Sequence, residues 1–254
     1  MKSIIYGPVP SWRLGRSLGV DLVSNKGKTC SFDCIYCQLG RTIYPLVERR
    51  EFVTVAQLAK ELELVKDIAA DYVTFSGMAE PTLASNLGEA IRIAKSILPL
   101  PVAVLTNSSL MPREDVCDDL AQADVVIAKV DAANEQMFRQ INNPVVSYPF
   151  DQILYSIEHF RKRFTGKLAL QMMFITINKD YARQMADIAR RLSPDEVQLN
   201  TPLRPCPIKP LAPDEIAAIE KEFTGLKVVN VYKAPKPEVV PLNLEETLRR
   251  RPKL

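Results

Sequence analysis

Three cysteines lie within eight residues, at Cys30, Cys34 and Cys37, with the spacing C-x3-C-x2-C. Thiolates are soft ligands that suit iron–sulfur clusters and zinc. On a [4Fe–4S] cluster, three thiolates leave one iron open, and a small molecule can bind there through nitrogen and oxygen. A structural zinc site would instead be closed by a fourth ligand, for which the remaining candidates are Cys117, Cys206 and the single histidine, His159. His159 falls inside a predicted helix and is interpreted as a half-buried structural residue, so the residues alone leave both the open cluster and a zinc site as candidates.

The composition is that of a globular protein without a disulfide framework. The 254 residues are 47% hydrophobic and 25% charged, which allows a sizeable core. Five cysteines, three of them clustered, indicate a metal site rather than disulfides. The formal net charge of +3 is too small to indicate nucleic-acid binding by itself. The segment Met1–Pro8 lacks the apolar run of a signal peptide, and no stretch approaches the length of a membrane span. We therefore expect a cytosolic protein with no membrane partner.

Short apolar runs alternate with longer amphipathic segments along the chain. The apolar runs predict strands at residues 18–23, 72–75, 102–105, 125–128, 168–175, 196–200 and 227–231. Thr54 and Gln57 form a capping-box pattern that opens a helix, and further helices are predicted at 85–98, 112–122, 134–141, 150–164, 181–192 and from Pro213. Repeated βα units imply parallel strands with right-handed crossovers. The sequence thus predicts an α/β fold, a partial (β/α)6-type TIM barrel with parallel strands.

The barrel core is predicted to cover residues 1–233, and residues 234–254 form a C-terminal extension. This extension is rich in proline and contains the run Arg249-Arg250-Arg251. We interpret it as a solvated surface tail rather than as an arm that binds nucleic acid.

Small or polar residues stand at the ends of several predicted strands. In parallel barrels the chemistry takes place at the carboxyl ends of the strands. The cysteine loop follows the first predicted strand, and the second, third, fourth and sixth strands end at or near Gly77, Ala79, Glu80, Asn107, Lys129, Asp131, Leu199 and Asn200. We expect these residues to meet around the cysteine loop.

The cysteine triplet, with the aromatic Tyr36 directly before the last cysteine, resembles the defining motif of the radical S-adenosylmethionine superfamily. The resemblance implies a [4Fe–4S] cluster whose open iron chelates the amino and carboxylate groups of S-adenosylmethionine. It also implies that an electron from the cluster cleaves the sulfonium and yields a 5′-deoxyadenosyl radical. An external electron donor, such as flavodoxin or ferredoxin, is then the expected partner.

The segment Ser76–Thr82 is similar to the superfamily's glycine-rich motif, which receives the methionine amino group. The resemblance assigns the carboxylate of this motif to Glu80, and the sequence departs from the usual pattern at Ala79, where glycine is common. It implies that Asp131 contacts the ribose hydroxyls, that Lys129 meets the methionine carboxylate, and that Leu199 or the adjoining backbone contacts adenine. Asn107 either reaches the ligand or caps the next helix, and Asn200 is expected to face the barrel.

The block Tyr6–Gly19, joined to these motifs, resembles a group of wybutosine-synthesis-like iron–sulfur oxidoreductases over roughly Tyr6 to Pro205. The resemblance suggests a tRNA base as substrate. Arg13, Arg16 and Arg41 flank the cysteine loop, and their fork-shaped guanidinium groups suit phosphate or carboxylate. We expect them to recognise an anionic substrate at the barrel mouth, with a solvated charged face as the alternative.

Several functions remain open at this stage. The substrate of a radical enzyme could be a nucleic-acid base, a small metabolite, or a partner protein from which a glycyl hydrogen is abstracted. A non-catalytic iron–sulfur electron carrier is the alternative outside catalysis, although such a carrier has no need for Glu80 and Asp131 beside an open iron. Cys117 is predicted to be a packed thiol, and Cys206 could donate a hydrogen atom to a substrate radical.

Overall fold

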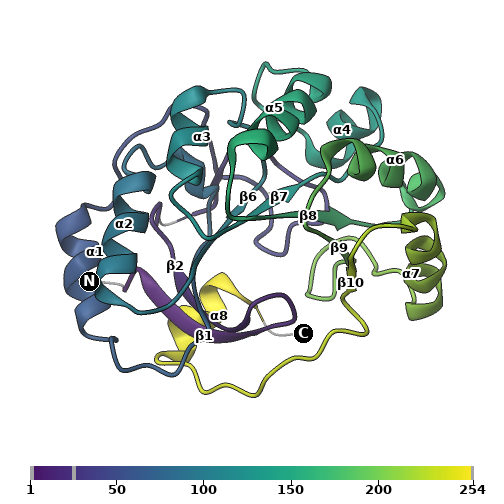
Figure 1. The fold of residues 1–254 in the computed structure, drawn as a ribbon. Coiled ribbons are helices and arrows are strands. Elements are labelled where there is room, and N and C mark those ends of the chain that lie inside the picture. Colours follow the sequence, from purple (N-terminus) through teal and green to yellow (C-terminus); the bar gives the residue numbers. More distant parts are fainter. Residues whose placement is uncertain (1–2, 25–26, 253–254) are drawn as a thin grey trace.

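The protein is organised around one curled eight-stranded sheet with helices along its outer face (Figure 1). The computed structural model describes residues 3–24 and 27–252. The expectations for the N-terminal segment and for the C-terminal extension include residues 1–2 and 253–254, which lie outside the described residues. Within the described ranges, no helix is long and apolar enough to cross a membrane.

The sheet is almost entirely parallel. Its order is β1-β2-β5-β6-β7-β8-β9-β10, and each neighbouring pair is parallel except β1 with β2. The strands are β1 (Ile5–Ser11), β2 (Gly15–Val20), β5 (Tyr72–Phe75), β6 (Val102–Thr106), β7 (Val125–Lys129), β8 (Lys167–Met173), β9 (Glu196–Asn200) and β10 (Val228–Asn230). The predicted α/β fold with a parallel partial barrel is confirmed.

Helices follow the strands as the alternation predicts. They are α1 (Val55–Glu63), α2 (Leu87–Ile97), α3 (Glu114–Leu120), α4 (Glu135–Asn142), α5 (Phe150–Arg163), α6 (Ala182–Leu192), α7 (Pro213–Glu220) and α8 (Leu244–Arg250). The N-terminus of α1 is capped as predicted, because the Thr54 side chain accepts a hydrogen bond from the Gln57 backbone N–H at 3.1 Å. This bond satisfies one of the N–H groups that the first turn of a helix leaves free.

The two faces of the sheet pack against different groups of residues. The main hydrophobic core lies between the sheet and the helices, and it includes Leu199 of β9. A small cluster of Leu14, Ala103, Val125, Ile127 and Ala169 fills the inside of the curve. Since successive side chains of a strand point to opposite faces, the neighbour of Leu199, Asn200, points inward and lines a cavity.

Strand β1 was not predicted from the sequence. It carries Pro8 and Pro10, which lack the N–H group that a central strand must donate. Here β1 is an edge strand that pairs only with β2, so the missing donors can be tolerated.

The expectation of a solvated C-terminal tail is wrong. Residues after β10 run across the open side of the curled sheet and end in α8, which lies beside β1 (Figure 1). The side chain of Arg250 is fully buried, with ion pairs to Asp21 at 2.8 Å and to Glu246 at 2.6 Å. A cap at Asn243, whose side chain accepts from the Glu246 backbone N–H at 2.9 Å, starts the helix. Composition alone did not reveal this short helix.

We predict that Arg250→Ala strongly destabilises the protein. Removing Arg250 leaves the buried Asp21 carboxylate without its ion-pair partner, which costs about 3–5 kcal/mol, whereas Glu246 keeps its ion pair with Arg249 at 2.8 Å. Urea unfolding followed by circular dichroism measures the change. Arg139→Ala is the matched control, because Arg139 pairs with Glu135 on the exposed surface of α4 and its loss should cost about 0.5 kcal/mol or less. Equal midpoints for the two variants would contradict the bracing role of Arg250.

Candidate functional site

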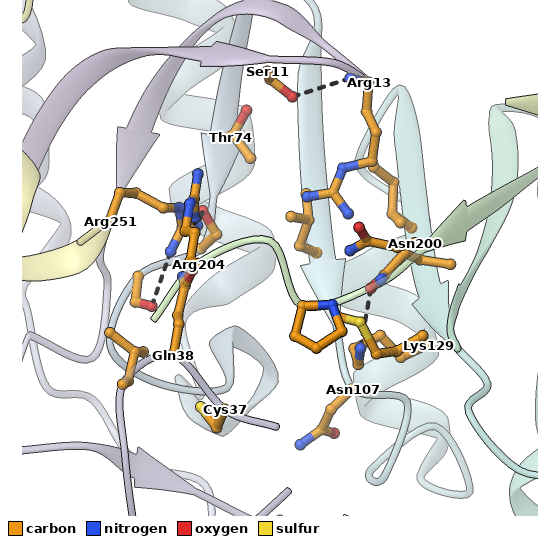
Figure 2. Close-up of a pocket in the computed structure, with 18 of the residues that line it drawn as sticks. Ser11, Arg13, Cys37, Gln38, Thr74, Asn107, Lys129, Asn200, Arg204 and Arg251 are labelled. Atoms are coloured by element: carbon orange, nitrogen blue, oxygen red, sulfur yellow. Dashed lines mark hydrogen bonds between the residues drawn. The ribbon is translucent and has the colours of Figure 1, made fainter. Parts of the chain in front are cut away.

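A cavity of about 330 Å³ opens at the carboxyl ends of the parallel strands. Its walls come from the β1–β2 turn, the cysteine loop, the loops after β5, β6 and β9, and the end of the C-terminal extension. This position matches the edge at which parallel barrels carry their chemistry. Figure 2 shows part of the lining, with Cys37 and Asn107 at one end of the view.

All three clustered cysteines line this cavity. The loop that carries them folds back on itself, since the Cys37 N–H donates to the Cys34 carbonyl at 3.0 Å. Nitrogen donors approach the sulfurs from outside the loop: Asn107 Nδ2 lies 3.5 Å from Cys30 Sγ, and Asn142 Nδ2 lies 3.4 Å from Cys34 Sγ. Hydrogen bonds to sulfur stabilise thiolate ligands and tune iron–sulfur clusters.

The electrostatics of the loop depend on whether the sulfurs are charged. Burial, helped by Glu80 and Cys34, raises the pKa of Cys30 to about 12. Burial also raises the pKa of Cys34. Burial lowers the pKa of Lys28, but the three cysteines outweigh that effect and the net shift is upward. The Cys30 and Cys34 thiols are therefore protonated at neutral pH, and a metal that binds them must displace their protons.

The donor set fits an iron–sulfur cluster. Three sulfurs share one cavity, amide groups donate to two of them, and Lys28 supplies a positive charge beside them. Among the residues described, no three His, Cys, Asp or Glu side chains converge on a position for a single ion. A cubane cluster does not require such convergence, because each thiolate binds its own iron. Cys30, Cys34 and Cys37 would hold the cluster.

Glu80 lies at the wall beside Cys30 and is only 3% exposed. Its carboxylate accepts hydrogen bonds from Thr106 Oγ1 at 2.7 Å, Thr82 Oγ1 at 2.7 Å and the Asn107 N–H at 2.7 Å. Burial raises its pKa, although these donors oppose the shift. No ion pair within the described part of the chain includes Glu80. A buried carboxylate that faces a cavity without a cation is suited to receive one from a ligand.

The glycine-rich segment before Glu80 passes close to Asp21. A Cβ on Gly77 would lie 2.3 Å from Asp21 Cγ, so only glycine fits there. The Met78 N–H donates to Asp21 Oδ2 at 3.3 Å, and the same oxygen accepts from Arg250 Nε at 2.8 Å. Ala79 is not among the residues with positive φ, so its departure from glycine causes no backbone strain. The buried tail arginine thus braces this segment through Asp21.

Asp131 is placed differently from the expectation. It is 2% exposed and is not part of the cavity lining. Its carboxylate accepts from the Tyr36 hydroxyl, from Asn142 Nδ2 at 3.0 Å and from the Met173 N–H at 2.9 Å, and it pairs with Lys129 at 3.3 Å. These contacts make Asp131 a positioning residue for the cysteine loop and for Lys129. They favour this role over direct contact with a ribose.

The remaining expected ligand contacts divide into two groups. Asn107, Lys129 and Asn200 line the cavity, as does Tyr36, and Figure 2 shows Lys129 and Asn200 on one side of it. Lys129 is held there by Gln171, whose Oε1 accepts from Nζ at 3.1 Å. Leu199 is fully buried in the core on the helix side of the sheet. Its side chain is therefore not brought to the cavity, and only its backbone remains available.

The arginines flanking the cysteine loop do not act as a group. Arg13 lines the cavity. Arg16 instead pairs with Asp71 at 2.7 Å, and Arg41 pairs with Asp33 at 2.7 Å with 85% of its side chain exposed. Neither lines the cavity, so the expectation that Arg16 and Arg41 stand at the barrel mouth is wrong. Both arginines instead form ion pairs with carboxylates outside the cavity.

Two arginines that sequence reasoning missed do line the cavity: Arg204 and Arg251. Arg204 lies in the loop directly after β9, so the rule that sites follow strand ends could have identified it. Arg251 arrives from the C-terminal extension, and no sequence signal connects it with the barrel.

The candidates for closing a zinc site are not brought to the cysteine loop. Cys117 is buried, as predicted, and its thiol donates to the Met111 carbonyl at 3.2 Å. Cys206 is half-buried and donates to the Ile208 carbonyl at 3.2 Å. His159 is exposed on α5, where its ring stacks on Tyr155. None of the three lines the cavity.

Known proteins are similar to this chain in sequence and in fold. The profile of the radical SAM superfamily matches residues 24–189, and the chain belongs to that superfamily. Among curated proteins, UPF0026 protein MJ1312 of Methanocaldococcus jannaschii is 38% identical over 226 residues, covering 86% of this chain and 70% of that protein. UPF0026 protein slr1464 of Synechocystis is 37% identical over 206 residues, covering 81% of this chain and 77% of that protein.

Solved structures of more distant proteins share the fold. SuiB of Streptococcus suis, bound to S-adenosylmethionine, has a TM-score of 0.63 at 13% identity over 80% of this chain and 48% of its own. Native anSMEcpe with bound AdoMet has a TM-score of 0.63 at 16% identity over 85% of this chain and 64% of its own. The chain therefore spans about half to two thirds of these proteins. At such identities the likeness shows the fold alone.

We predict that changing any one of Cys30, Cys34 or Cys37 to alanine abolishes the iron–sulfur cluster. Each sulfur is one of only three protein ligands, so its loss exposes the cluster to dissociation. Iron and sulfide analysis and visible absorption of anaerobically reconstituted protein measure the content. Cys117→Ala is the control and should retain the cluster, because that thiol bonds to the Met111 carbonyl away from the cavity. Stoichiometric zinc in a colourless sample would overturn the assignment.

Proposed function

We propose that this protein is a radical S-adenosylmethionine enzyme that generates a 5′-deoxyadenosyl radical and abstracts hydrogen from a substrate. The observation that carries the proposal is the pairing, in one cavity, of three thiols with a buried carboxylate that has no cation partner among the described residues. When bound, a [4Fe–4S] cluster would supply the electron that splits S-adenosylmethionine into methionine and the radical.

The chain's own residues supply the binding. Glu80 presents its carboxylate for the methionine ammonium, and Thr82, Thr106 and the Asn107 backbone hold that carboxylate in place. Lys129 is oriented by Gln171 and Asp131 and offers its ammonium to the methionine carboxylate. Asn107 and Asn200 provide neutral polar groups for the nucleoside.

A finer assignment follows from the resemblance to wybutosine-synthesis-like oxidoreductases. We propose a tRNA base or another anionic molecule as substrate, a flavodoxin or ferredoxin as electron donor, and a cytosolic location. The relatives at 37–38% identity carry only the name UPF0026, which indicates no substrate. Activation of a partner protein by abstraction of a glycyl hydrogen remains the second candidate. A plain electron carrier has no use for a ligand-binding carboxylate such as Glu80.

The test is reductive cleavage of S-adenosylmethionine. Reconstituted protein given dithionite should form 5′-deoxyadenosine and methionine in equal amounts, measured by liquid chromatography and mass spectrometry. Protein that carries a full cluster and binds S-adenosylmethionine, yet forms no 5′-deoxyadenosine above the background without enzyme, would show that the proposal is wrong.

We predict that Glu80→Gln keeps the cluster and weakens the binding of S-adenosylmethionine. Losing a charge-assisted hydrogen bond costs about 1.5–3 kcal/mol, which is roughly a ten- to hundredfold rise in the dissociation constant. Calorimetry on reconstituted protein measures it. Glu63→Gln, an exposed glutamate at the end of α1, is the control and should bind as the unchanged protein does. Unaltered affinity in Glu80→Gln would remove Glu80 from the ligand site.

A further inference from the structure

Three arginines face one end of the cavity without any carboxylate partner. Arg13, Arg204 and Arg251 come from the β1–β2 turn, the loop after β9 and the end of the C-terminal extension. Within the described residues, none of them takes part in an ion pair. The fold thus gathers three distant parts of the chain to place like charges together.

The partners that these arginines do have are neutral. Arg204 donates to Gln38 Oε1 at 2.8 Å. Arg251 donates to Ser76 Oγ at 2.8 Å and to the backbone carbonyls of Arg250 at 2.9 Å and Gly77 at 3.5 Å. The guanidinium of Arg13 lies over the Trp12 ring, 5.0 Å from its centre, and its buried Nε has no hydrogen-bond partner. Arg13 and Arg204 therefore keep most of their side-chain N–H groups for a ligand, and Arg251 keeps fewer.

Such a grouping is unfavourable unless an anion joins it. Burial, together with Arg251 and Arg204, lowers the pKa of Arg13 to about 9. Burial, with Arg251, lowers the pKa of Arg204 to about 10. Both groups still carry their charge at neutral pH, and their mutual repulsion is relieved when a negative group binds between them.

The arginines are separate from the groups that would hold methionine. Figure 2 shows Arg204 and Arg251 next to each other on one side of the cavity, with Lys129 and Asn200 on the other side. Arg13 reaches in from the β1–β2 turn. Glu80 and Lys129 already account for the charged end of S-adenosylmethionine, so the arginine end of the cavity is left for a second molecule.

We propose that Arg13, Arg204 and Arg251 bind a phosphate group of the substrate. This inference rests on the proposed function, since it assigns the second ligand of the same cavity. A phosphate monoester carries more negative charge than a carboxylate, and the oxygens of either a monoester or a diester can accept from several guanidinium groups at once. Two sources share this chemistry, a small phosphorylated metabolite and a phosphate of an RNA substrate.

The test is calorimetry of the full chain with its cluster reconstituted, under saturating S-adenosylmethionine and at low salt. Inorganic phosphate is the first probe, and uridine monophosphate and total tRNA are titrated in parallel arms. Phosphate should bind the unchanged protein, and Arg13→Ala or Arg204→Ala should each weaken it roughly tenfold, as expected for a lost charge-assisted hydrogen bond. Arg13→Lys should recover part of the loss, because the charge returns without the fork.

Matched controls are available in the two arginines that pair at the surface. Arg16→Ala and Arg41→Ala remove the same charge outside the cavity and should leave phosphate binding unchanged. Binding of the mononucleotide alone assigns the phosphate to a small substrate. Binding of tRNA alone, with a steep dependence on salt, assigns it to an RNA. Either result supports the proposal.

Three outcomes overturn it. The first is that no phosphate probe binds. The second is that the cavity variants and the surface variants bind phosphate with the same affinity. The third is that affinity for S-adenosylmethionine falls in Arg13→Ala and Arg204→Ala by as much as affinity for phosphate, which would place the arginines in the S-adenosylmethionine site. Failure of the proposed function has a different measurement: the unchanged protein would form no 5′-deoxyadenosine, whatever its affinity for phosphate. Arg251→Ala is a less specific variant, because Arg251 follows Arg250, whose buried ion pair with Asp21 stabilises the fold, and the change could disturb that contact.

Discussion

Parallel strands that share one sheet all end at the same edge, and this constraint determines where the cysteine loop, Glu80, Asn107 and Lys129 lie. The cysteine loop leaves that edge after β2, Glu80 after β5, Asn107 after β6 and Lys129 at the end of β7. Residues separated by a hundred positions in sequence therefore meet without any long excursion of the chain. The β1–β2 turn and the C-terminal extension then add the arginine wall, which the parallel strands do not supply.

Two carboxylates in this region, Glu80 and Asp131, are about equally buried, so their hydrogen-bond and ion-pair partners distinguish a ligand-binding role from a positioning role. The Asp131 carboxylate is surrounded by donors of the chain, including Lys129, and its oxygens are occupied by Tyr36, Asn142 and the Met173 backbone. The Glu80 carboxylate has hydroxyl and backbone donors but no cation, and it faces the cavity. Both were assigned to ligand contact by resemblance. Their surroundings favour binding for Glu80 and positioning for Asp131.

The parts of the fold that could be predicted are those in which local pattern and burial agree. Strands β5 and β9 occur at the predicted residues, because each is a short run bounded by turn-forming neighbours. Strand β1 was missed because its prolines argue against a strand unless its place at the sheet edge is known. Helix α8 was missed because its arginines indicate a solvated segment unless their buried partners elsewhere in the chain are known. The same limit applies to the site. Arg16 and Arg41 are near the cysteine loop in sequence, yet Asp71 and Asp33 decide where their side chains lie.

The carboxylate of Asp21 is shared between the docked C-terminal helix and the glycine-rich segment of the cavity. Asp21 holds both elements in one arrangement, so their stabilities are coupled, and such a coupling is reciprocal: the factor by which the first event favours the second equals the factor by which the second favours the first. A ligand that fixes the segment at Gly77 and Met78 should therefore slow the local opening of α8, and amide hydrogens of that helix should exchange more slowly when the cavity is filled. Hydrogen exchange in the C-terminal helix would therefore report whether the cavity is occupied, although nothing in the sequence connects this helix with the cavity.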